Sequence, residues 1–145
     1  MVRNSLRVVA VAVLAGILAA CVGSAAGQLM PRTALDQGKT FFVEKHEKDT
    51  RNLAESIAQT MRARGLSATS GAAADRSQGV DYVVTYTDRW MWDMRMYLAD
   101  LRIEVRDARD NSLMGYGQSS QSSLKAMGQS HEDIIVTALN ELLGV

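Results

Sequence analysis

Apolar and charged residues alternate within the segment Arg95–Asp107, strictly so from Ala99 to Arg106. The odd-numbered positions from 97 to 105 are apolar: Tyr97, Ala99, Leu101, Ile103 and Val105. The even-numbered positions from 100 to 106 are charged: Asp100, Arg102, Glu104 and Arg106. Because successive side chains of a β-strand point to opposite faces, this pattern predicts a strand with one buried and one solvent-exposed face.

Other segments rich in β-branched and aromatic residues, or bounded by turn residues, are also predicted strands. They are Lys39–Glu44, a brief Leu66–Thr69, Val80–Thr87 and Leu113–Gln118. The last of these follows turn residues at 108–111 and forms the second arm of a hairpin. Its glycines, Gly115 and Gly117, weaken the strand or permit a bulge.

Two segments carry apolar residues at helical spacing. The first begins at a cap on Asp49 or Thr50 and runs to Arg64, where Gly65 suits a helix C-terminus. Its apolar stripe is Leu53, Ala54, Ile57, Ala58 and Met61. The second begins at Ser130, which forms a capping box with Asp133. Its stripe is Ile134, Ile135, Ala138, Leu139, Leu142 and Leu143.

The order of these elements is β-α-(β)-β-β-β-α. It predicts an α+β fold, a two-layer sandwich in which two helices cover one face of an antiparallel or mixed sheet. Residues 38–145 form this single domain, and the chain of 145 residues suits one domain.

The N-terminus has the pattern of an export signal. Arg3 and Arg7 precede an uncharged apolar run, Val8–Leu18. Eleven helical residues span about 16 Å, which is too short for a hydrocarbon core of about 30 Å. The run ends in Leu18-Ala19-Ala20-Cys21, which resembles the lipobox of bacterial lipoproteins.

The lipobox resemblance implies cleavage between Ala20 and Cys21, so that residues 1–20 are a signal peptide. It also implies diacylglycerol on the Cys21 thiol and a fatty acid such as palmitate on the new amino group. Two or more acyl chains anchor a protein stably, whereas one does not. The alternative is an ordinary signal peptide cut near Ala25–Ala26, with an accidental cysteine at position 21.

The residue after the cysteine is Val22 rather than aspartate. By resemblance to enterobacterial sorting, this predicts a location on the periplasmic face of the outer membrane. Residues 21–37, the lipidated cysteine and the Gly-, Ala- and Ser-rich segment after it, are predicted to form a flexible tether that holds the domain about 20 Å from the bilayer.

Charge and cysteine content exclude several classes of protein. The chain has 16 basic and 16 acidic residues, and loss of Arg3 and Arg7 with the leader leaves 14 against 16, a net charge of −2. This balance argues against nucleic-acid binding, which needs a basic face. The single cysteine excludes an internal disulfide.

No pattern of a catalytic, metal or cofactor site occurs in the sequence. His46 lies among acidic residues and His131 in a predicted helix, but neither belongs to a ligand motif. A nucleophile elbow and a phosphate-binding loop are absent. We therefore predict a protein that is not an enzyme and has no cofactor.

The segment Trp90–Tyr97 stands out because it contains both tryptophans and three of the eight methionines of the chain. In a continuous strand, Trp90, Trp92, Met94 and Met96 share a face opposite to the apolar face of Tyr97–Val105. Either a bulge or turn shifts the register and sends these residues into the core, or they form an exposed patch for a partner or an apolar ligand. The sequence leaves both alternatives open.

Asp81–Tyr86, Trp90–Met94, Leu101–Val105 with Asp107, and Lys39–Phe42 together resemble a family of small Gram-negative outer-membrane lipoproteins. The resemblance implies no defined activity. The order of elements is also similar to that of lipopolysaccharide-assembly and curli-secretion lipoproteins, a likeness of layout that does not transmit function.

These patterns together predict a membrane-anchored, non-catalytic binding or assembly accessory of the cell envelope. Its partner, besides the membrane, is expected to be an envelope protein or glycolipid. Two alternatives are a structural or stress-related envelope lipoprotein without a specific ligand, and a periplasmic hydrolase with an unrecognised site.

Overall fold

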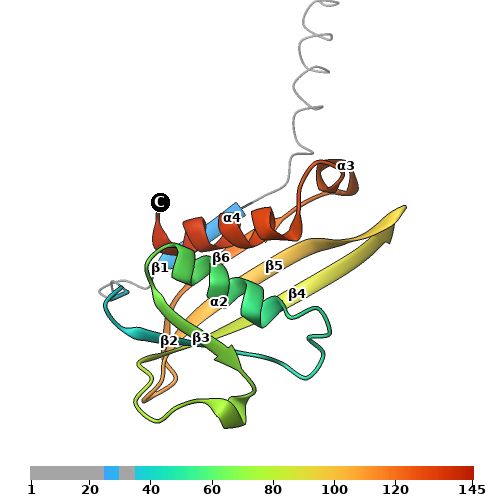
Figure 1. Cartoon of the computed structure of the whole chain (residues 1–145). Coiled ribbons are helices and arrows are strands. Elements are labelled where there is room, and N and C mark those ends of the chain that lie inside the picture. The colour runs from blue at the N-terminus through green and yellow to red at the C-terminus, as the bar shows by residue number, and fades with distance from the viewer. Residues whose placement is uncertain (1–24, 30–34) are drawn as a thin grey trace, which may run out of the picture.

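The computed structural model describes residues 25–29 and 35–145, and it shows the predicted α+β sandwich (Figure 1). Six strands form one mixed sheet in the order β1-β6-β5-β4-β2-β3. Strand β2 (Thr40–Glu44) runs parallel to β3 (Ser67–Gly71) and to β4 (Tyr82–Asp93). The pairs of β4 with β5 (Arg95–Asp107), β5 with β6 (Leu113–Ser120), and β6 with β1 (Ala25–Leu29) are antiparallel.

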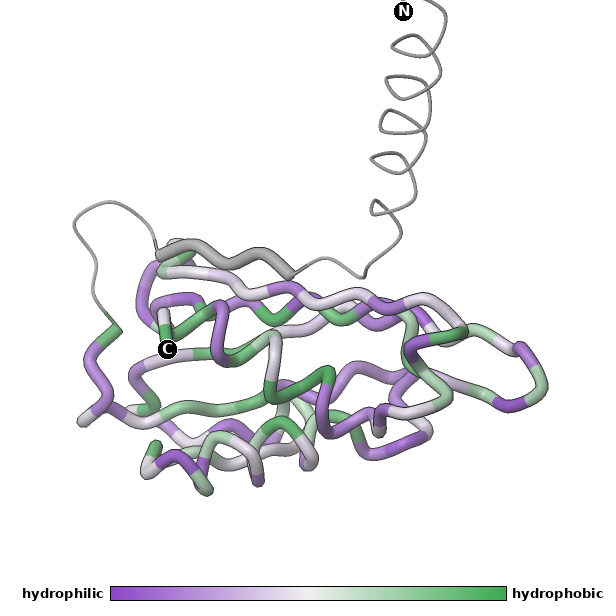
Figure 2. The backbone as a smooth tube through the Cα atoms, turned by 90° about the horizontal axis from the view of Figure 1, so that it is seen from above, coloured by the Kyte–Doolittle hydropathy of each residue, from purple (hydrophilic) through white to green (hydrophobic). Residues whose placement is uncertain are grey.

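The two long helices, α2 (Leu53–Ala63) and α4 (His131–Leu143), lie side by side on one face of the sheet (Figure 1). Their apolar stripes form one core with Leu101, Ile103 and Val105 of β5 and with Val84 and Tyr86 of β4. Tyr97 and Ala99, which were predicted on the same face, lie outside this core, because an extra residue in β5 reverses the alternation there. In the tube coloured by hydropathy, hydrophobic stretches alternate with hydrophilic ones along strands and helices (Figure 2). The fully buried side chains include Phe41, Ile57, Leu101, Ile103 and Leu139.

Helix α4 begins where the sequence predicted. The Ser130 hydroxyl accepts a hydrogen bond from the backbone N–H of Asp133, and the Asp133 carboxylate accepts one from the N–H of Ser130. Helix α2 begins differently. The residue at its N-cap position, Asn52, has a left-handed backbone (φ 55°), and its side chain makes no capping hydrogen bond. The carboxylate of Asp49 instead reaches the N–H groups of Leu53 and Ala54, at 2.9 and 3.0 Å.

Three elements differ from the prediction. Strand β4 continues to Asp93 rather than ending at Thr87, so β4 and β5 form a long hairpin that turns at Met94. A 3-10 turn, η2 (Ala73–Asp75), occupies the predicted loop before β4. A short helix, α3 (Ser123–Ala126), follows β6 in the segment predicted to be a polar connector.

The segment predicted to be a tether contains strand β1, and this corrects the description of residues 21–37 as flexible throughout. Alanine and glycine, which make up most of this strand, have low strand propensity, and the local pattern therefore carries no strand signal. The open edge of β6 supplies the pairing partner, with Ala25 opposite Ser119 and Leu29 opposite Gly115.

Candidate functional site

A bulge in β5 decides which way Met96 and Leu98 point, whereas Trp90 and Trp92 keep the parity of the buried Val84 and Tyr86 in β4. Arg89 pairs with Asp100, but the next residue, Trp90, pairs with Leu98, so that Ala99 is the extra residue. Because one extra residue reverses the parity of a strand, Leu98 and Met96 turn to the face that carries Leu101 and Val105. This is the register shift that was one of the two alternatives.

Of the two alternatives, burial in the core or an exposed patch, neither holds for all four residues Trp90, Trp92, Met94 and Met96. Trp90 is half-buried and packs against the core. Trp92 and Met94 lie farther along the hairpin, with 70% and 89% of their surfaces exposed. Met96 is 43% exposed and lies near Trp90 and His131. The hairpin is therefore a core element at its base and an exposed apolar element at its tip (Figure 1).

Trp90 is held in place by polar groups on three sides. Its indole N–H donates to the Asp88 carboxylate at 2.8 Å. The guanidinium of Arg51 lies 4.6 Å from the ring centroid, in cation–π range, and the His131 ring lies at 6.3 Å. The other oxygen of Asp88 lies 2.8 Å from His46 Nε2. His46 is thus a partner of Asp88.

Beneath this cluster, Asp49 joins α2 to the sheet. In addition to the two α2 amides, the buried carboxylate accepts hydrogen bonds from the Arg51 N–H and, at 2.8 Å, from the Tyr86 hydroxyl. Burial raises the pKa of Asp49, but these donors outweigh burial and hold the pKa below its usual value. For Tyr86, burial and the neighbouring carboxylate both raise the pKa, so the hydroxyl stays protonated.

A pocket of about 310 Å³ opens beside Trp90, between the hairpin base and the start of α4. Its lining includes Trp90, Tyr97, Gln121, Gln129 and His131. A second hollow of about 280 Å³, which also borders Trp90 and His131, extends toward Arg51. Together they make a concave surface with an aromatic wall.

Two residues that line the larger pocket carry buried side-chain oxygens without a protein donor. Gln121 Nε2 donates to the carbonyl of Leu98 at 2.7 Å, which fixes the orientation of the amide and leaves Oε1 unpaired. Gln129 Oε1 is also buried and unpaired. Buried polar atoms are normally satisfied, so these two oxygens can accept from a ligand or water with N–H or O–H donors once a movement of the lining side chains exposes them.

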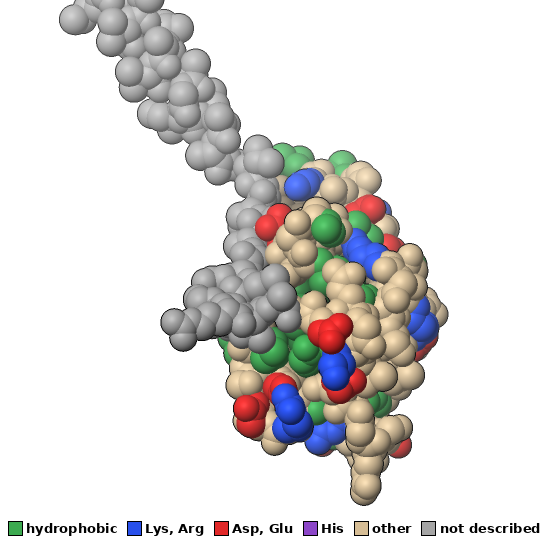
Figure 3. All heavy atoms as spheres, turned by 90° about the vertical axis from the view of Figure 1, so that its left-hand side faces the viewer, with side chains coloured by type: hydrophobic (Ala, Val, Ile, Leu, Met, Phe, Trp, Pro, Cys, Tyr) green, Lys and Arg blue, Asp and Glu red, His purple; other side chains and the backbone are tan. Residues whose placement is uncertain are grey.

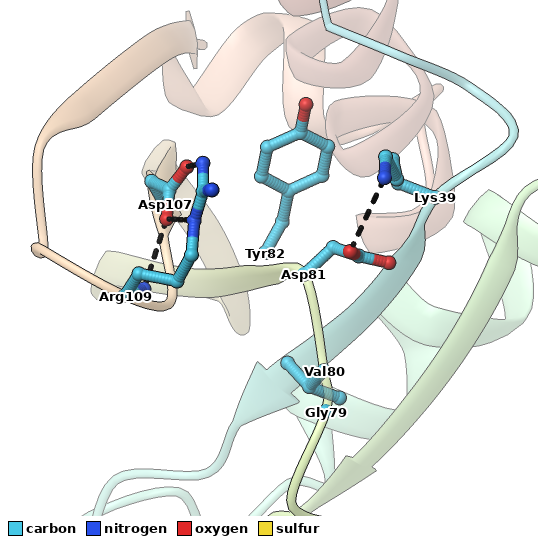
Figure 4. Close-up of a pocket in the computed structure, with 7 residues that line it drawn as sticks. All are labelled: Lys39, Gly79, Val80, Asp81, Tyr82, Asp107 and Arg109. Atoms are coloured by element: carbon cyan, nitrogen blue, oxygen red, sulfur yellow. Dashed lines mark hydrogen bonds and ion pairs between the residues drawn. The ribbon is translucent and has the colours of Figure 1, made fainter.

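A further pocket of about 250 Å³ lies at the opposite end of the sheet, around Lys39, Asp81, Tyr82, Asp107 and Arg109 (Figure 4). Its charges are already paired. Asp81 contacts Lys39 at 3.6 Å and accepts two bonds from Thr40. Bonds from the Arg109 side chain and N–H hold the pKa of Asp107 at about 2. Basic and acidic side chains also lie next to each other on this end in the space-filling view (Figure 3). We assign this pocket a structural role.

Known structures share this arrangement of sheet and helices. Two structures of the PelC dodecamer from Paraburkholderia phytofirmans, one of them a point variant, superpose with TM-scores of 0.59 and 0.61. They are 19% and 18% identical to this chain, and the matches cover 83% of it and 97% and 98% of the PelC chains. TolB from Acinetobacter baumannii matches with a TM-score of 0.38 and 17% identity, over 80% of this chain and 31% of TolB. No protein-family model and no curated protein matches the chain. At these identities the likeness to PelC establishes a common fold.

The remaining predicted site residues, Ala20 and Cys21, lie outside the described part of the chain, and the expected cleavage and lipidation site lies there with them. Among residues 25–29 and 35–145, no three His, Cys, Asp or Glu side chains are grouped to hold a metal ion. Within the same ranges, no helix is both long and apolar enough to cross a bilayer.

Sequence reasoning missed Gln121 and Gln129. Each is a single glutamine in a polar segment, and neither spacing nor composition separates it from a solvated residue. The sequence offers one signal for them. Gln121 directly follows the predicted hairpin and Gln129 directly precedes the predicted last helix, and such connecting segments meet when the chain folds.

Proposed function

We propose that this protein is a lipid-anchored, non-catalytic binding accessory of the bacterial cell envelope, held through Cys21 on the periplasmic face of the outer membrane. The pocket beside Trp90 is its binding site. The observation that carries this assignment is that Gln121 and Gln129, whose buried amide oxygens are unpaired, line one pocket together with Trp90.

The lining of the pocket selects a class of ligand. The amide oxygens accept from hydroxyl or amide groups, and aromatic rings contact the apolar side of a ligand. Glu132 and Arg95 at the rim have opposite charges, so the site does not favour a strongly charged ligand. The hydroxyl-rich headgroup of an envelope glycolipid combines these features, and a polar segment of an envelope protein is the second choice.

The PelC chains of the same fold come from dodecamers. That likeness supports an assembly role, in which several copies of this chain associate. An assembly of lipidated copies would hold several pockets at one membrane surface and raise the avidity for a repeating or membrane-bound ligand.

Changing Gln129 to leucine separates binding from stability. Leucine has nearly the same volume but no acceptor, so the variant should fold with equal or slightly higher stability, within about 1 kcal/mol, because it removes an unpaired buried oxygen. Its affinity for the ligand should fall about tenfold, the cost of one hydrogen bond to a buried acceptor. Emission of Trp90 in a Trp92→Phe background, titrated with lipopolysaccharide in detergent, measures binding, and detergent alone is the control.

Saturable binding that weakens in the Gln129→Leu protein supports the assignment. Equal binding by both proteins removes the pocket from the proposal. An absence of any response, with urea unfolding unchanged, favours the alternative of a structural envelope lipoprotein without a glycolipid ligand.

A further inference from the structure

Exposed apolar side chains gather at one end of the sheet. The hairpin tip carries Met91, Trp92, Met94 and Met96, and the short helix α3 and its C-cap carry Leu124 and Met127, exposed by 81% and 68%. Strand β6 ends at Ser120, opposite Asp100, so α3 follows at the end of the sheet from which the hairpin projects (Figure 1). We call these six residues the apolar end. Apolar residues exposed together in this way mark an interaction surface.

The chain enters the domain at this same end. Ala25, the first residue of β1, pairs with Ser119, near the last residue of β6. The opposite end of β1, Leu29, pairs with Gly115, near the start of β6. A lipid anchor on Cys21 would therefore connect to the domain at the end of the sheet that carries these six residues.

The reach of the intervening chain is short. Cys21 precedes Ala25 by four residues, which span at most about 14 Å. The hairpin extends farther in the same direction. Ala25 pairs with Ser119, and Ser119 pairs with Leu101, so Ala25 and Leu101 lie at the same height along the sheet. From Leu101 to Met94 the strand advances by six residues, not counting the bulged Ala99, which is about 20 Å. With Cys21 at the lipid headgroups, the tip meets the bilayer before the link is fully extended.

The side chains suit a membrane interface. Tryptophan is enriched at the level of the headgroups, and methionine is a flexible apolar side chain that adapts to irregular surroundings. The charges nearby are balanced, since Arg89 is paired with Asp100 while Arg95 and Asp93 flank Met94. The surface therefore fits a lipid interface through its apolar side chains rather than through attraction to anionic lipid.

We propose that the apolar end docks on the bilayer that holds the Cys21 lipid, with Trp92 and Met94 inserted among the headgroups. This inference rests on the lipid anchor of the proposed function. It replaces a domain held off the membrane on a flexible tether by a domain that lies against the membrane. Docking also brings the pocket beside Trp90 to the membrane surface, within reach of a glycolipid headgroup.

Quenching of tryptophan by brominated lipid tests the contact. The lipidated mature chain is reconstituted in phosphatidylcholine vesicles with plain acyl chains or with chains brominated near the glycerol. Two variants isolate the reporters: Trp90→Phe leaves Trp92, and Trp92→Phe leaves Trp90. We expect brominated lipid to reduce the emission of Trp92 at least about twofold, because interfacial tryptophans lie at the level of the bromines, and to change that of Trp90 far less.

Charge substitutions at two exposed apolar residues supply a matched pair. Met94→Asp, in the Trp90→Phe background, should abolish the quenching of Trp92, because a carboxylate at the tip opposes insertion. Aspartate tolerates the left-handed backbone of position 94 (φ 59°), so folding is preserved. Val145→Asp, at a residue 82% exposed at the other end of the molecule, should leave the quenching unchanged.

Flotation of the same vesicles distinguishes the two levels of the proposal. Protein that fails to float overturns both the anchor and the docking. Protein that floats with Trp92 unquenched overturns the docking alone. If Trp92 is not quenched but its emission wavelength shifts with protein concentration, the docking proposal is also overturned. The hairpin tip then makes contacts between copies of the chain.

Discussion

Replacing Gly117 with alanine is expected to destabilise the domain by about 3 kcal/mol, the upper part of the usual range for overpacking a core. Gly117 lies in β6 directly under α4. A Cβ at this position would overlap the carbonyl oxygen of Ala138 and lie 2.7 Å from the backbone nitrogen of Leu142. Because both atoms belong to the helix backbone, α4 as a whole must move away from the sheet.

Urea unfolding measures this change, and Gly128→Ala is the control. Gly128 follows α3, and a Cβ there would have no neighbour within 4 Å. Its substitution should change the free energy of unfolding by less than about 0.5 kcal/mol. Equal, small effects of the two substitutions would contradict the close approach of α4 to β6.

Replacing Asp49 with asparagine is expected to cost about 2–3 kcal/mol at pH 7, because charge-assisted hydrogen bonds to a buried group are lost. The carboxylate accepts from three backbone amides and from Tyr86, whereas an amide offers one acceptor oxygen and turns its NH₂ toward donors. Tyr86→Phe removes only one donor and should cost about 1 kcal/mol.

The effect of Asp49 should depend on pH. The folded protein holds the pKa of Asp49 below its usual value, so the carboxylate contributes stability that is fully present above the unfolded pKa of about 4. This contribution is lost as the pH falls through the lower folded pKa. The difference in unfolding free energy between wild type and Asp49→Asn should therefore shrink between pH 5 and pH 2, about the range in which the carboxylate protonates. A constant difference over that range would contradict the network around Asp49.

Local patterns predicted the elements whose stability is local. The alternation in β5 located that strand from Arg95 to Asp107, and the capping box located the start of α4 at Ser130. Elements that depend on distant partners were not predictable in this way. Strand β1 exists through its pairing with β6, and β4 continues past Thr87 because β5 lies beside it, although Asp88 and Arg89 interrupt its apolar pattern.

The candidate site shows the same division. Trp90 and its neighbours were singled out by composition, but the bulge at Ala99, which turns Met96 and Leu98 to the inner face of β5, has no signature in the sequence. Gln121 and Gln129 enter the site from the connectors on either side of α3. A pocket formed by a hairpin, a connector and a helix start exists only when all three have packed.

The mass of the mature N-terminal peptide, from protein purified out of membranes of a Gram-negative host, tests the anchor on which the functional account depends. We expect a chain that begins at Cys21 and carries diacylglycerol on its sulfur and a fatty acyl chain on its amino group. A mature chain that begins elsewhere, or a residue 21 without acyl mass, would contradict the account and leave a periplasmic domain with no hold on the bilayer.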